Sequence, residues 1–273
     1  MPEGRQYYII KEHPLRIMSK CKSHSKGTLV SFLAGICMLY AFLNWIPEIL
    51  SLYFPATNLD LMAALPGVDE QMLSRLNGTP LVIYVYALFF SGVVNLGEAL
   101  YALTYIRNRK VEYKALTEGA PLYLKTLGIY ILQLLIVAFW SIFFVIPGIV
   151  VALNFSQAYY VLADDPDKGV TQVLAESKML MQGNRLTYLR LLLYYLPYLL
   201  FGYMPAFLIS GLIAGMKLPV AGLLIISMLA ELPVFAAHGY ICLGRTVFYE
   251  LMINEGFAYF KYAGQEAFRE YER

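Results

Sequence analysis

Three ionisable side chains stand seven residues apart inside a long apolar run near the end of the chain: Glu231, His238 and Arg245. On one helix they would form a stripe about 21 Å long, because seven residues make two turns less about 20°. A charge at mid-bilayer costs about 2.5–3.5 kcal/mol even on a lenient scale, so such groups usually face a cavity or a partner. The spacing therefore indicates a polar stripe that binds protons, cations or a polar ligand.

Two other apolar runs each carry a pair of polar side chains at i, i+3, the spacing that places them on one helix face. These pairs are Asn95 with Glu98 and Asn154 with Gln157. Together with the stripe they predict a polar cavity between three helices, in which Glu98 and Glu231 are protonatable or cation-binding groups. The alternative is that the carboxylates are hydrogen-bonded between helices as structural contacts, while Arg245 reaches lipid phosphate at the interface.

Composition identifies the elements that must position these residues. Of 273 residues, 59% are hydrophobic and 15% are charged, against about 45–50% and about 25% in soluble domains. Apolar runs long enough for membrane-spanning helices recur along the chain. We therefore predict an all-α polytopic membrane protein, a six-transmembrane-helix bundle within residues 28–252. The spans are expected at 28–54, 81–106, 122–146, 149–163, 186–216 and 218–252.

The basic residues predict the orientation. With both termini in the cytoplasm, every Lys and Arg except Arg75 and Lys217 lies on the inner side, as the positive-inside rule requires. The predicted soluble parts are a basic cytoplasmic arm (1–27), an outer loop (55–80) and a cytoplasmic tail (253–273). The arm is either an interfacial helix interrupted at Pro14 or a loosely ordered tail. We expect a multi-pass protein of the bacterial cytoplasmic membrane.

A short amphipathic helix is predicted between spans four and five, at residues 166–183, because its apolar residues follow a 3–4 spacing. The preceding Asp164 and Asp165 would favour its positive dipole end, and Gly183 suits a left-handed residue at its close. We expect this helix to lie under the inner leaflet and cover the bundle. The alternative is a docking site for a cytoplasmic protein partner.

Small residues predict two close approaches. Pro147-Gly148 predicts a tight reversal that joins the third span to a short fourth one. On the fifth span small residues recur every four positions: Gly202, Ala206, Ser210 and Ala214, with Gly211 and Gly215 beside them. Small residues let helix backbones approach in lipid. The stripe predicts packing within the chain, with a homodimer face as the alternative.

Catalytic signatures are absent from the sequence. There is no Gly-x-Ser-x-Gly elbow, His-Glu-x-x-His pair or phosphate-binding loop. Cys21, Cys37 and Cys242 have no metal or redox spacing, so we expect free, reduced thiols. We predict no enzyme activity, no cofactor and no metal. A net charge of +2 does not indicate a nucleic-acid partner.

Several short motifs resemble an uncharacterised family of bacterial integral membrane proteins, a domain of unknown function. The matching residues are Pro147-Gly148-Ile149, the run from Tyr159 to Asp164 with Pro166, the pattern Ser177-x-x-Leu180-Met181-x-Gly183, and Phe248-Tyr249-Glu250-Leu251. The resemblance is clearest over residues 115–190, and the segment from Leu193 to Pro197 departs from it. That family is distantly similar to the membrane domain of glycerophosphodiester phosphodiesterases. The resemblance implies a membrane fold and brings no established activity or catalytic residue.

Two classes of function remain. The polar faces predict binding or transport of a lipid, a peptide or a small amphiphile through an intramembrane cavity. The amphipathic helix, the basic arm and the lack of an energy-coupling motif predict instead a non-transporting scaffold, an accessory or immunity-type subunit. In both cases the lipid bilayer is the partner that surrounds the chain.

Overall fold

The computed structural model describes residues 8–10, 12–53, 81–213 and 219–253, and all regular structure within them is helical. The helices are α1 (Pro14–His24), α2 (Leu29–Ser51), α5 (Leu81–Asn108), α6 (Tyr123–Phe143), α7 (Val145–Phe155), α8 (Ala158–Asp164), α9 (Val170–Leu180), α10 (Arg185–Ile213) and α11 (Val220–Ile253). Two short 3₁₀ turns, η1 (Tyr113–Leu116) and η2 (Ala120–Leu122), precede α6. The predicted outer loop and all of the predicted tail except Ile253 lie outside the described residues.

Within the described residues, six segments are long and apolar enough to cross a membrane. They are α2, α5, the stretch from η1 through α6, the stretch from α7 through α8, α10 and α11. A helix of about 20 apolar residues spans the hydrocarbon core, and the shortest of the six stretches has 20 residues. The prediction of six spanning segments is confirmed at this level.

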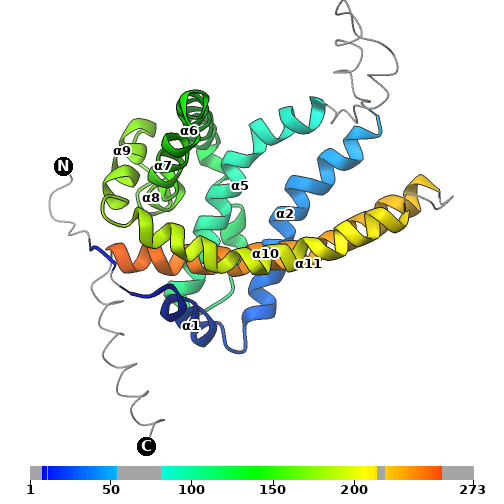
Figure 1. Cartoon of the computed structure of the whole chain (residues 1–273), viewed down its shortest axis with the longest axis horizontal. Coiled ribbons are helices and arrows are strands. Elements are labelled where there is room, and N and C mark those ends of the chain that lie inside the picture. The colour runs from blue at the N-terminus through cyan, green and yellow to red at the C-terminus, as the bar shows by residue number, and fades with distance from the viewer. Residues whose placement is uncertain (1–7, 11, 54–80, 214–218, 254–273) are drawn as a thin grey trace, which may run out of the picture.

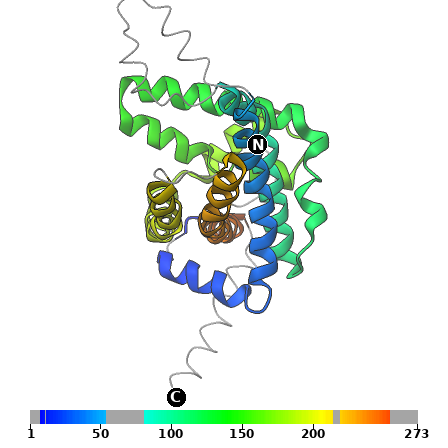
Figure 2. The same ribbon diagram turned by 90° about the vertical axis from the view of Figure 1, so that its right-hand side faces the viewer.

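The long helices form three pairs that spread apart from a common region (Figures 1 and 2). The pairs are α2 with α5, α6 with α7, and α10 with α11. In Figure 1 the α6–α7 pair points toward the viewer whereas α10 and α11 run across the view, and Figure 2 shows the reverse. We call the common region the hub: α1, α8, α9, the first turns of α6 and α10, and the last turns of α5 and α11. The α6–α7 pair therefore diverges from the α10–α11 pair away from the hub, whereas α11 keeps its contact with α2 toward their far ends.

The hub contains the main hydrophobic core. Its largest fully buried side chains are aromatic, and they include Tyr101, Tyr105, Tyr160, Phe248 and Tyr249. The rings of Tyr160 and Tyr249 stack with centroids 5.2 Å apart, so α8 is packed against the end of α11. Large apolar side chains away from the hub are mostly exposed, as expected where lipid is the solvent.

The reversal between the third and fourth spans lies earlier than Pro147-Gly148, so that prediction was wrong. α6 ends at Phe143, and Phe144 alone is extended, with φ −156° and ψ 139°, before α7 begins at Val145. Pro147 falls in the first turn of α7, where a missing N–H breaks no helical hydrogen bond. A Cβ on Gly148 would lie 3.1 Å from the Cα of Ser141. The glycine therefore allows α7 to approach α6 closely.

The fourth span was predicted as one continuous helix, but it consists of two. The helix is interrupted at Ser156 and Gln157, between α7 and α8. The hydroxyl of Ser177 on α9 forms hydrogen bonds with backbone groups on both sides of this interruption. The Ser177 Oγ donates to the Asn154 carbonyl at 2.7 Å and accepts from the Gln157 N–H at 3.2 Å. Inserted side chains are a known cause of helix breaks. The periodicity of the sequence did not predict the interruption at Ser156 and Gln157.

The predicted amphipathic helix is present as α9, and its apolar face lies against α6, α7 and α8. Gly183 has φ +81°, the left-handed conformation predicted for it. The expected role of Asp164 and Asp165 at the start of α9 was wrong. α9 begins at Val170 after the cap residue Gly169, several residues too late for those carboxylates. The position of α9 under a lipid leaflet stays a prediction.

The N-terminal arm is held to the hub where it is described. The Tyr8 N–H donates to the Met252 carbonyl at 3.0 Å, and the Ile10 N–H donates to the Asn184 Oδ1 at 2.8 Å. Pro14 begins α1 instead of interrupting a helix, because proline is well suited to the first helical turn. The arm thus joins the hub through both residues 8–10 and α1.

Candidate functional site

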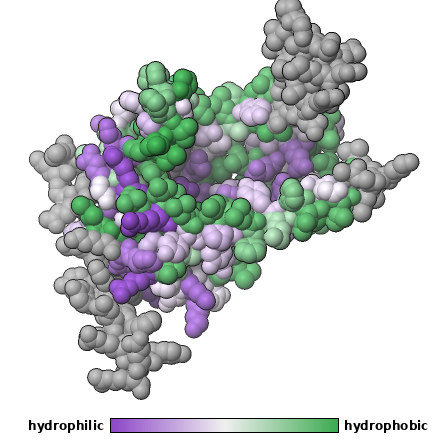
Figure 3. Space-filling model, viewed as in Figure 1, coloured by the Kyte–Doolittle hydropathy of each residue, from purple (hydrophilic) through white to green (hydrophobic). Residues whose placement is uncertain are grey.

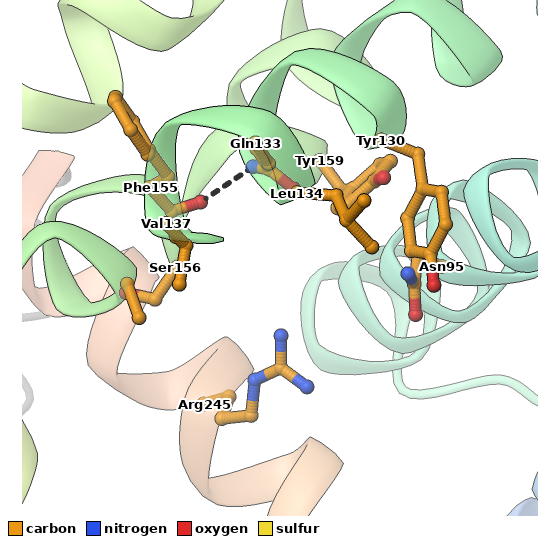
Figure 4. Close-up of a pocket in the computed structure, with 10 residues that line it drawn as sticks. Asn95, Tyr130, Gln133, Leu134, Val137, Phe155, Ser156, Tyr159 and Arg245 are labelled. Carbon is orange, nitrogen blue, oxygen red and sulfur yellow. Dashed lines mark hydrogen bonds between the residues drawn. The ribbon is translucent and has the colours of Figure 1, made fainter. Parts of the chain in front are cut away.

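A cavity of about 310 Å³ lies between the α6–α7 pair, α5, the start of α8 and α11. We call it the Arg245 pocket (Figure 4). Its lining residues are Asn95, Tyr130, Gln133, Leu134, Val137, Ala152, Phe155, Ser156, Tyr159 and Arg245. Figure 3 shows hydrophilic residues in a hollow between the α6–α7 and α10–α11 pairs.

Arg245 supplies the only formal charge among the ten described lining residues. Figure 4 shows its guanidinium directed into the space below α6 and α7. Its side chain is 28% exposed, and its carboxylate contact among the described residues, from Nη1 to the Glu98 Oε1, is 3.8 Å long. The guanidinium carbon also lies 5.9 Å from the centroid of the Tyr160 ring. The buried Nε has no hydrogen-bond partner among the described residues, so the cation is only loosely compensated.

Amide and hydroxyl groups form the polar part of the wall. Gln133 donates from Nε2 to the Phe155 carbonyl at 3.0 Å, which fixes α6 against the end of α7 and orients the amide. Tyr130 and Asn95 carry their polar groups on the opposite side of the opening in Figure 4. These side chains can donate or accept hydrogen bonds, so the wall suits a polar group placed beside Arg245.

The remaining wall is apolar and open. Leu134 is 48% exposed, Ala152 is exposed and Val137 is half-buried. Beyond them the α6–α7 pair carries a continuous set of exposed large apolar side chains, which end at the Phe144 reversal. Figure 3 shows this pair as a strongly hydrophobic surface. The pocket therefore connects a cationic interior with a surface suited to lipid chains.

Of the seven residues predicted to line a cavity, Asn95 and Arg245 line the pocket. Glu98 is buried behind the guanidinium and accepts a hydrogen bond from the Tyr40 hydroxyl at 3.4 Å. His238 stacks on the Tyr40 ring with centroids 4.6 Å apart. Glu98 and His238 therefore adjoin the site through Tyr40, a residue of α2 that sequence spacing did not identify.

Asn154 and Gln157 are buried at the break of the fourth span and are not among the lining residues. Their backbone groups bond to Ser177, and the Gln157 Nε2 donates to the Ser156 Oγ at 3.1 Å. Their side-chain oxygens have no partner among the described residues. The structure therefore assigns both residues to the packing of α7 and α8 against α9.

Glu231 lies apart from Glu98, toward the other end of α11. Its Oε2 accepts a hydrogen bond from the Trp45 Nε1 at 3.0 Å, and nearby the Ser227 hydroxyl donates to the Glu48 Oε1 at 3.1 Å. Both contacts join α11 to α2. The predicted stripe on α11 is therefore divided, with Glu231 and His238 facing α2 and Arg245 facing the pocket.

Sequence reasoning missed Tyr130, Ser156 and Tyr159 as wall residues. The signal for Tyr130 was its i, i+3 spacing to Gln133, a polar residue within the predicted third span. Ser156 and Tyr159 line the wall with Ala152 and Phe155. These four residues have the i, i+3, i+4, i+7 spacing of one helix face, so this periodicity was the signal that could have identified them.

A second charged cluster lies in the hub. Arg107 bonds the Asp164 Oδ1 through Nη1 and the Glu250 Oε1 through Nε, each at 2.7 Å. The Tyr249 hydroxyl donates to the Asp164 Oδ2 at 2.8 Å. These contacts join α5, α8 and α11 at their hub ends. They give a structural role to Asp164 and to two residues of the Phe248–Leu251 motif, Tyr249 and Glu250.

The next feature is the arrangement of the described cysteines and acidic residues. Within the described ranges no group of three His, Cys, Asp or Glu side chains is placed to hold an ion. Cys21, Cys37 and Cys242 are free. Burial raises the pKa of the Cys21 thiol to about 12, so this thiol stays protonated at neutral pH and acts as a packed core side chain.

These observations define the chain as an α-helical, multi-pass membrane protein with a pocket that is lined by one cationic side chain, Arg245. Residues 129–255 are similar to a family described as "Protein of unknown function (DUF975)". The matched region includes every pocket residue except Asn95. No curated protein and no solved structure matches the chain. The suggested relation to glycerophosphodiester phosphodiesterases stays a prediction.

Proposed function

We propose that this protein binds or transports an amphiphile in the membrane, and that it does so through the Arg245 pocket. The observation that carries this proposal is the pocket's composition. A half-buried cation and hydrogen-bonding groups lie at one end, and exposed apolar residues of α6 and α7 lie at the other. Ligand sites typically combine an apolar lining with a few polar groups that orient the ligand.

A binding role also explains why a charge is tolerated there. Ionisable residues within spanning segments are costly, and they usually mark ligand or ion pathways. Arg245 lies too far from the Glu98 carboxylate for a direct hydrogen bond, at 3.8 Å. A purely structural ion pair would be expected to have closer geometry, such as the 2.7 Å contacts of Arg107.

The scaffold alternative has weaker support. It rested on the amphipathic helix, the basic arm and the lack of an energy-coupling motif. Of these, the amphipathic helix α9 has Val173, Leu174, Ser177 and Leu180 buried within the chain. The exposed face of α9 includes Gln172 and Lys178, so a partner would have to recognise a polar surface. Deleting residues 166–183 would remove part of the hub core and would not test partner binding cleanly.

A lipid with a photoreactive acyl chain tests the proposal in nanodiscs. We expect cross-links in the peptides of α6 and α7 that line the pocket, and Ala152→Trp should reduce them at least about threefold by narrowing the opening. Ile142→Trp is the control, because Ile142 is 81% exposed on the same helical pair and does not line the pocket. Equal labelling of both variants and the unmodified protein would exclude the pocket as the binding site.

A further inference from the structure

The charge balance of the Arg245 pocket selects the kind of headgroup it can hold. Arg245 is cationic, and none of the other nine described residues that line the pocket is acidic or basic. Asn95, Tyr130 and Tyr159 add groups that can donate hydrogen bonds. A cationic headgroup would be repelled by the guanidinium, whereas an anionic one would be attracted at close range in a low-dielectric setting.

The guanidinium has unused capacity for an anion. Its buried Nε has no partner among the described residues, and the 3.8 Å separation from Glu98 leaves room for a stronger contact. Arginine binds phosphate and carboxylate groups through two parallel N–H···O bonds. We propose that the Arg245 pocket binds the phosphate or carboxylate headgroup of an amphiphile whose hydrocarbon chain lies along α6 and α7.

The dimensions and surroundings of the pocket support a headgroup with an attached chain. Its volume of about 310 Å³ is at the lower end of the range for small-molecule sites, about 300–1,000 Å³. It therefore accommodates a headgroup and the first carbons of a chain, but not two long acyl chains. The rest of the ligand would follow the exposed apolar residues from Leu134 toward Phe139 and Phe143, where lipid already surrounds the helices.

Native mass spectrometry of the full chain in a neutral detergent tests this inference, which rests on the proposed function. The probes are dioleoyl phosphatidylglycerol, which is anionic, and dioleoyl phosphatidylcholine, which has the same chains and no net charge. We expect the anionic lipid to bind at least about tenfold more tightly. Arg245→Gln should remove most of that difference, because a hydrogen-bonded charge contact is worth about one factor of ten or more.

Matched variants separate the site from general surface charge. Arg190→Gln removes a positive charge from an exposed position on α10 and should leave the lipid preference unchanged. Arg245→Lys should retain part of the preference. Glu98→Gln removes the neighbouring negative charge and should tighten binding of the anionic lipid alone. Because Glu98→Gln is a predicted gain, misfolding cannot produce the expected result.

The outcomes distinguish this inference from the proposed function. If folded Arg245→Gln keeps the full anionic preference, or if Glu98→Gln weakens anionic binding, the headgroup assignment is overturned. Binding of both lipids that is blocked by Ala152→Trp would then still support an amphiphile site. Competition by soluble glycerol phosphate at the same concentration as the lipid would identify a free anion as the ligand and would also overturn the inference. If Ala152→Trp leaves the binding of both lipids unchanged, the proposed function itself is rejected.

Discussion

Ser177 has a structural role at the level of single atoms, because one hydroxyl compensates a break in a membrane-spanning segment. Backbone groups without partners are expensive in the hydrocarbon region, where water cannot bond to them. Ser177 is fully buried, and its hydroxyl contacts the backbone on both sides of the break, at Asn154 and Gln157. The broken segment is therefore stable only with α9 in place.

Replacing Ser177 by Ala should lower the free energy of unfolding by about 1–3 kcal/mol, the usual cost of leaving a buried polar group without its partner. Unfolding of the purified protein in mixed detergent micelles would measure the change. Ser210→Ala is the control, because the Ser210 hydroxyl is exposed and donates to the Phe207 carbonyl of its own helix. Equal effects of the two substitutions would show that Ser177 does not support the break.

Single residues also show what sequence spacing can and cannot predict about a site. The pattern on α11 selected Arg245, which lines the pocket, because a charge within an apolar run is visible in the sequence. It placed Glu231 and His238 with Arg245, although contacts with Trp45 and Tyr40 turn those two toward α2. Which neighbour faces each part of a helix depends on tertiary packing, and periodicity along one helix does not contain that information.

At the scale of elements, helix existence was predictable and helix junctions were not. Long apolar runs specify spanning helices because the bilayer requires internally bonded backbone. The turn at Phe144 and the break at Ser156 have different origins. Phe144 is an extended apolar residue between two helices, and the break at Ser156 is compensated by a distant side chain. Neither position carries the glycine or proline by which turns are usually recognised.

The small-residue stripe on α10 gives a prediction about helix pairing. A Cβ on Gly202 would lie 2.9 Å from the Cα of Val234 on α11, whereas a Cβ on Gly211 would meet nothing within 4 Å. Gly202→Ala should therefore force α10 and α11 apart at a cost of about 1–3 kcal/mol. Gly211→Ala should be neutral or slightly stabilising, because alanine reduces the freedom of the unfolded chain.

Thermal unfolding of the two alanine variants in detergent measures the difference, and size-exclusion chromatography reports oligomeric state. A lower melting temperature for Gly202→Ala alone would support packing within the chain. Dissociation of a dimer by Gly211→Ala, with unchanged stability for Gly202→Ala, would instead identify the stripe as a homodimer face.

At the scale of the whole molecule, the hub and the far ends of the helical pairs differ in chemistry. Lys20, Arg107 and Lys168 each pair with carboxylates at the hub, whereas the far ends of the pairs expose mainly apolar side chains (Figure 3). Lys and Arg residues that flank spanning helices concentrate on the cytoplasmic side. We therefore expect the hub to face the cytoplasm and the Phe144 reversal to face the outer side.

Labelling with a membrane-impermeant maleimide tests this orientation in intact cells. In a background where Cys21, Cys37 and Cys242 are replaced by Ala, Phe144→Cys should react from outside because Phe144 is 71% exposed at the far end of the α6–α7 pair. Lys178→Cys, on the exposed face of α9, should react only after the membrane is permeabilised. The reversed pattern would invert the topology. Reaction of both variants from the same side would show that the stretch from α7 through α8, which lies between them, does not cross the bilayer, and the pocket would then require an entry route other than the lipid phase.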